Sequence, residues 1–137
     1  MTTIAETAPA SPSMRLLGRI LSGIVIVFML FDGAIKLVPW PVVMQTMDRM
    51  GYGSSESFAR TLGVISIACT VLYAIPPTSI LGAIMLTGYL GGAMASHVRI
   101  DSPLFTHILF GLYLNLMLWG GLWLRDRGLR DLMPWRR

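Results

Sequence analysis

The sequence predicts an all-α integral membrane protein, a four-helix bundle with a short amphipathic interfacial helix between its first and second spans. Hydrophobic residues make up 54% of the 137 residues and charged residues only 13%, which is about half the charged share of a typical soluble domain. The apolar residues also lie in four long runs, each close to the roughly 17–25 residues of a bilayer-spanning helix. A chain this short cannot enclose four such helices in protein, so we expect a bilayer around them.

We expect four spans, at about residues 16–38, 57–75, 79–97 and 103–124, in a single domain over residues 14–137. Residues 1–13 are small, polar and proline-containing, which predicts a disordered tail. They lack the basic start of a cleaved signal peptide. Only residues 76–79 separate the second and third runs, so these two spans are expected to form a tight helical hairpin.

The longest connection, residues 39–57, contains the predicted interfacial helix. A Pro-Trp-Pro sequence ends the first span, because proline cannot continue a helix. Val43, Met47 and Met50 then recur at i, i+4 and i+7, which gives a short helix one apolar face. We expect this helix to lie on the membrane surface or to fold back as a lid.

The distribution of basic residues predicts the orientation. Seven of the eleven lysines and arginines flank the side of the predicted bundle that carries both termini. They are Arg15, Arg19, Arg125, Arg127, Arg130, Arg136 and Arg137. The positive-inside rule therefore places both termini of this multi-pass chain in the cytoplasm. Since these charges flank spans, the net charge of +4 does not indicate a nucleic-acid partner.

Small residues predict where helices approach each other. Gly88 and Gly92 form a GxxxG pair in the third span, which indicates close packing of a neighbouring helix. Gly18 and Ser22 give a weaker signal of the same kind in the first span. Tyr89, beside the first of these glycines, is interpreted as a packing residue.

Six ionisable residues gather near the ends of the spans that face away from the termini. They are Asp32, Lys36, Arg60, His97, Arg99 and His107. Ionisable side chains are costly inside a bilayer, so each needs a partner or a function. All six fall within one or two helical turns of the same interface, which predicts a ligand-binding polar pocket near the non-cytoplasmic face. Asp32 and Lys36, at i and i+4, can neutralise each other.

The chemistry of this pocket suits the carbonyl or phenolate head of an apolar ligand such as a quinone. Histidines exchange protons near neutral pH, so the candidates for acid–base catalysis are Asp32, His97 and His107. The alternative for Asp32 is a buried ion pair that only fixes packing. The long side chains of Lys36 and the arginines can instead reach the membrane surface. Cys69 is the only cysteine, and no metal site is expected.

A series of different short motifs is spread along most of the chain. They comprise FDGAIKL at 31–37, MGY at 50–52, LGV at 62–64, IPPT at 75–78, LGA at 81–83, GYLGGA at 88–93, HVR at 97–99 and LRD at 124–126. Their order and spacing resemble the DoxX-like family of small four-helix bacterial membrane proteins, over roughly residues 17–134. The resemblance implies a four-helix bundle in the plasma membrane, and it marks Lys36, His97 and Arg99 as recurring polar positions without assigning their roles.

The same resemblance implies links to membrane redox chemistry. The family takes its name from a membrane subunit of an archaeal thiosulfate:quinone oxidoreductase. Relatives are associated with quinone or thiol stress, and distant ones act as membrane chaperones. This sequence carries no redox centre of its own, so a partner protein or a bound quinone would have to supply one.

Three functions remain open from the sequence. The first is binding of a quinone-like or other apolar ligand, as an accessory to a membrane redox or detoxification system and without any other tightly bound cofactor. The second is a membrane assembly factor or scaffold that has no ligand chemistry and acts with a membrane protein partner or a second copy of the chain. The third is a small membrane enzyme that acts on an apolar substrate through Asp32 and His97 or His107, and the sequence does not decide whether the chain is an enzyme.

Overall fold

The computed structural model describes residues 9–38 and 40–133, and these residues form helices and no strands. In chain order the elements are α1 (Pro12–Leu37), α2 (Pro41–Arg49), α3 (Glu56–Ala74), the 3-10 turn η1 (Pro76–Thr78), α4 (Ser79–Arg99), the π-helical turn η2 (Leu104–Ile108), α5 (Phe110–Arg125) and α6 (Arg127–Leu132). Four of the helical segments are long and apolar enough to cross a membrane: Pro12–Leu37, Glu56–Ala74, Pro76–Arg99 and Leu104–Arg125. The predicted fold class is confirmed, and the chain is an integral membrane protein.

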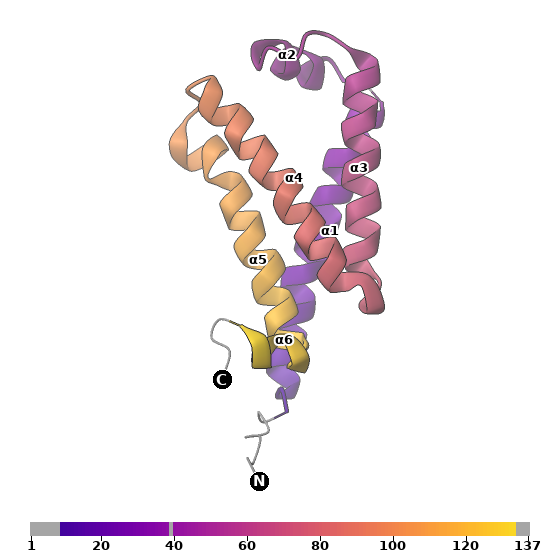
Figure 1. Ribbon diagram of the computed structural model, residues 1–137, viewed down its shortest axis with the longest axis vertical. Coiled ribbons are helices and arrows are strands. Elements are labelled where there is room, and N and C mark those ends of the chain that lie inside the picture. The colour runs from indigo at the N-terminus through magenta and orange to yellow at the C-terminus, as the bar shows by residue number, and fades with distance from the viewer. Residues whose placement is uncertain (1–8, 39, 134–137) are drawn as a thin grey trace.

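The four long helices run along the length of the molecule, with α2 at one end and α6 and the start of α1 at the other (Figure 1). We call these the α2 end and the terminal end. Helix α1 packs against α3 and α5, and α4 packs against the same two helices. The predicted hairpin is formed by α3 and α4, which η1 joins.

Local signals in the sequence explain where the helices begin. The Ser11 hydroxyl accepts a hydrogen bond from the Met14 N–H at 3.3 Å, and Ser55 caps α3 in the same way through the Phe58 N–H. Most of the predicted tail, residues 1–8, lies outside the described residues, as does Pro39 of the predicted helix stop. Helix α1 already begins at Pro12.

Small residues close the bundle at the terminal end. A Cβ added at Gly121 of α5 would lie 2.6 Å from the Ser22 hydroxyl and 2.9 Å from the Gly18 carbonyl oxygen of α1. The weaker of the two predicted packing signals is thus confirmed. Nearby, the fully buried Tyr73 hydroxyl donates to the Leu118 carbonyl at 2.8 Å, and it lies 2.8 Å from the Ser22 hydroxyl.

The stronger packing signal, the GxxxG pair of Gly88 and Gly92, does not mark a contact with another helix of this chain. A Cβ added at Gly88 or Gly92 of α4 would meet no atom of the residues that the structure describes within 4 Å. A GxxxG pair removes side chains from one helix face, but it does not decide whether another helix or an empty space lies against that face. Here the bare face of α4 borders a cavity.

Candidate functional site

A partly open cavity of about 570 Å³ lies between the helices at the α2 end. Its walls come from α1, α4, α5 and the start of α3, and residues of α2 cover it. The volume falls within the range of roughly 300–1,000 Å³ that is usual for small-molecule sites. Most of the surface that faces the cavity is apolar, with a minority of polar atoms on its walls.

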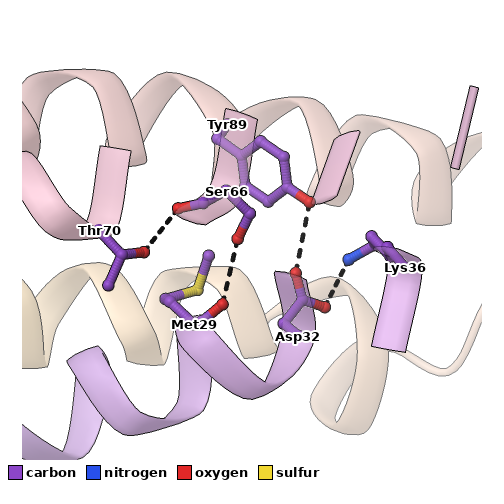
Figure 2. A network of polar contacts seen from close by, with 6 residues as sticks. All are labelled: Met29, Asp32, Lys36, Ser66, Thr70 and Tyr89. Carbon is purple, nitrogen blue, oxygen red and sulfur yellow. Dashed lines mark hydrogen bonds and ion pairs between the residues drawn. The ribbon is translucent and has the colours of Figure 1, made fainter. Parts of the chain in front are cut away.

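The main polar feature of the wall is an ion pair on α1. Lys36 Nζ lies 2.5 Å from Asp32 Oδ1, and the two side chains are only 16% and 23% exposed. The Tyr89 hydroxyl of α4 donates to Asp32 Oδ2 at 3.3 Å, and Lys36 Nζ lies 5.7 Å from the centre of the Tyr89 ring. We call these residues the Asp32–Lys36–Tyr89 cluster (Figure 2). It joins α1 to α4 across one side of the cavity.

A hydrogen bond between α1 and α3 lies beside this cluster, next to a second one within α3. The Ser66 hydroxyl of α3 donates to the Met29 carbonyl of α1 at 3.2 Å, and the Thr70 hydroxyl donates to the Ser66 carbonyl at 2.6 Å (Figure 2). Close approach is possible because Gly33 and Gly63 face each other, and a Cβ at Gly63 would lie 2.7 Å from the Gly33 carbonyl oxygen. The position of Asp32 is therefore set by the backbone on either side of it.

The two histidines lie side by side on the cavity wall. His97 is near the end of α4 and His107 is in η2, with ring centres 5.5 Å apart and nearly edge to face. Each ring shares a hydrogen bond through Nδ1, His97 with the Ser102 hydroxyl at 3.0 Å and His107 with the Thr106 hydroxyl at 2.8 Å. His97 is half-buried, whereas His107 is exposed. These contacts orient the rings beside the cavity.

The predicted interfacial helix covers this site. Val43 and Met47 of α2 are buried against Ala59 of α3, and Met50 lines the cavity, which confirms the predicted apolar face. Four methionine side chains, from Met29, Met47, Met50 and Met94, contribute to the lining. Methionine is flexible and polarisable, so it adapts to apolar ligands of varied shape.

Four of the six predicted site residues line this one cavity, and two do not. The structure brings together Asp32, Lys36, His97 and His107. Arg60 instead pairs with Glu56 at 3.3 Å on the exposed side of α3, where both side chains are more than half exposed. Arg99 is exposed and lies beside Gly51, with Nη2 3.2 Å from the position of an added Cβ.

Tyr89 is the site residue that the sequence did not predict. Its hydroxyl, alone on an otherwise apolar and glycine-rich stretch, is the one signal that could have indicated its role. Cys69 is buried and does not line the cavity. No cluster of three or more His, Cys, Asp or Glu side chains in the described ranges 9–38 and 40–133 could hold a metal ion.

The arrangement offers a ligand several polar contacts in an apolar surrounding. Lys36 presents donors, Asp32 and the Tyr89 oxygen present acceptors, and the imidazoles of His97 and His107 can do either. The bare α4 face at Gly88 and Gly92 leaves room beside these groups.

A known protein family matches the part of the chain that forms the cavity. The model of the DoxX-like family matches residues 20–121, a range that contains every residue of the cavity lining. No curated protein and no solved structure matches the chain.

Proposed function

The chain belongs to the DoxX-like family, and we propose that it binds a quinone-like apolar ligand in the cavity at the α2 end, as an accessory to a membrane redox or detoxification system. The observation that carries this proposal is one cavity with a partly buried ion pair on an otherwise largely apolar wall. Buried polar groups in an apolar pocket fix the orientation of a ligand, while apolar area supplies affinity.

The Asp32–Lys36–Tyr89 cluster would hold the polar head of the ligand. A quinone carbonyl accepts hydrogen bonds, and the Lys36 ammonium, which has three donors, can donate to it while still paired with Asp32. A planar ring fits against Gly88 and Gly92, where α4 carries no side chains. The lining methionines and Phe110 would contact the apolar part of the ligand.

The same proposal includes an orientation. Helix α1 begins and α5 ends at the terminal end, where α6 also lies (Figure 1). The described arginines of these segments are Arg15, Arg19, Arg125, Arg127 and Arg130, so the positive-inside rule favours a cytoplasmic location for that end. The cavity then lies near the non-cytoplasmic face of the plasma membrane. A ligand would reach it from the outer leaflet or from the water beyond.

The test uses the full chain, purified in mild detergent, with native mass spectrometry in the presence of a benzoquinone that carries a decyl tail. Gly88→Leu and Gly92→Leu should reduce binding at least tenfold, because each side chain would fill the cavity. Gly91→Leu is the matched control, since a Cβ at Gly91 also meets no atom within 4 Å but Gly91 does not line the cavity. Equal binding by all three variants and the unmodified chain contradicts the proposed site.

A small membrane enzyme is the second candidate, because Asp32, His97 and His107 line the same cavity. In that case the compound that co-purifies from native membranes should be a mixture of substrate and product, and His97→Gln should shift the ratio. A single compound, identical in the variant and the unmodified chain, argues against catalysis. A chain that binds neither a native compound nor the added quinone favours the scaffold alternative.

A further inference from the structure

We propose that residues 41–55, comprising α2 and the loop after it, form a lid over the cavity, and that the hydrogen bond between Tyr52 and Ser96 latches this lid. The lid itself does not depend on the proposed function; only its role in controlling access of a ligand rests on that proposal. Residues of α2 that border the cavity are Val42, Val43, Thr46 and Met47, and Met50 and Tyr52 follow them.

The lid packs on the rest of the molecule through a small apolar contact. Val43 and Met47 are its buried residues, and they form with Ala59 a cluster separate from the main core. Helix α2 has nine residues, a length at which a helix is marginal without tertiary contacts. Segments with few buried apolar contacts open at a lower free-energy cost than the core.

Two glycines supply a hinge at the C-terminal side of α2. Gly51 and Gly53 have φ values of +80° and +70°, a region that other residues adopt at a cost. Gly51 ends α2 through a paired turn, in which its N–H donates to the Asp48 carbonyl at 2.9 Å and the Tyr52 N–H donates to the Met47 carbonyl at 3.0 Å. Tyr52 therefore lies between two positions that tolerate backbone rotation.

The latch crosses from this loop to α4. The Tyr52 hydroxyl lies 2.6 Å from the Ser96 hydroxyl. Ser96 donates to the Gly92 carbonyl at 2.9 Å, which leaves its oxygen free to accept from Tyr52. Among the hydrogen bonds of the described residues, this is the one that joins the lid to α4. The Tyr52 ring also packs on Phe58, with ring centres 5.0 Å apart.

The test measures access to the cavity without any ligand. In a Cys69→Ala background, Gly92→Cys places a thiol on the cavity wall, and Gly91→Cys places one on the same turn but outside the lining. The labelling rate of each thiol by N-ethylmaleimide is measured on the full chain in detergent. With the lid latched, the thiol at 92 should react more slowly than the thiol at 91.

Removing the latch should speed the labelling at position 92 only. Tyr52→Phe keeps the ring on Phe58 and removes the hydroxyl, and Ser96→Ala removes its partner. Each should raise the rate about 2- to 10-fold, the factor that the net free energy of one hydrogen bond corresponds to. The double variant should be no faster than the single ones, because both remove the same bond.

Three results would overturn the latched lid. The first is an equal labelling rate for the thiols at 91 and 92 when Tyr52 and Ser96 are both present. The second is an unchanged rate at 92 after Tyr52→Phe and after Ser96→Ala. The third is an equal increase in rate at 91 and 92, which would indicate that the whole bundle has loosened. The outcome is independent of the quinone experiment. If Gly88→Leu leaves quinone binding unchanged while the labelling pattern holds, the proposed function fails and the lid stands.

Discussion

Lys36 has two roles to separate, since it neutralises Asp32 and also faces the cavity. Removal of one member of a buried pair leaves the other charge without its partner, which is more costly than replacing both by apolar groups. A variant in which both residues are replaced by apolar ones therefore separates the two roles. It should lose ligand binding if the pair binds the ligand, and keep it if the pair only fixes packing.

The first prediction is a stability and binding comparison at this pair. Lys36→Met should lower the free energy of unfolding by about 1–3 kcal/mol, because the Asp32 carboxylate loses its charged partner. Asp32→Leu with Lys36→Met should recover most of this loss. Thermal unfolding in detergent measures stability, and native mass spectrometry with the decyl benzoquinone measures binding.

The double variant decides between the roles. If it regains stability and still fails to bind the quinone, the pair serves the ligand. Recovery of both properties would mean that the charges serve packing alone.

At the scale of elements, glycine contacts differ between the two ends of the bundle. Gly121 of α5 packs on the α1 backbone, whereas Gly88 of α4 faces the cavity. The motif around Gly88 is the more prominent one in the sequence, yet it is Gly121 that allows two helices to pack closely.

The second prediction follows from this difference. Gly121→Ala should destabilise the protein by about 1–3 kcal/mol, because its methyl group would lie within 3 Å of Gly18 and Ser22 atoms. Gly88→Ala should leave the unfolding midpoint unchanged. Thermal unfolding of both variants in the same detergent checks this, and a larger loss for Gly88→Ala would contradict it.

The spans and the lid helix were predictable because helix length and the spacing of apolar residues depend on local sequence. The pairing of Arg60 with Glu56 was accessible to the same reasoning, since the two are four residues apart. The contact of Tyr89 with Asp32 could not be predicted in this way, because it joins residues 57 positions apart and depends on how α1 and α4 are placed on the two sides of the cavity. What borders the bare face of α4 is likewise a property of the assembled bundle.

At the scale of the whole molecule, the bundle is closed at the terminal end and hollow at the α2 end. Arginines towards the terminal end and a largely apolar cavity at the other give the protein two chemically distinct ends. This polarity is the basis of the proposed orientation.

The third prediction concerns that orientation in a bacterial plasma membrane. A reporter that is active only outside the cytoplasm should be inactive when fused after residue 137 and active when fused after Gly53, in the loop at the α2 end. Enzyme activity in intact cells, with fusion levels measured by immunoblot, provides the check. The reverse pattern would place the cavity on the cytoplasmic side.

The bare face of α4 has a consequence for how such a protein can change over evolutionary time. Gly88 and Gly92 border the space of the cavity, and among the described residues no atom lies within 4 Å of a Cβ added at either. Larger side chains there would narrow the cavity without the loss of stability that usually accompanies a buried substitution. A lineage could therefore alter the size of this cavity one codon at a time while its fold stayed intact, so the shape of the cavity and the architecture are free to diverge separately.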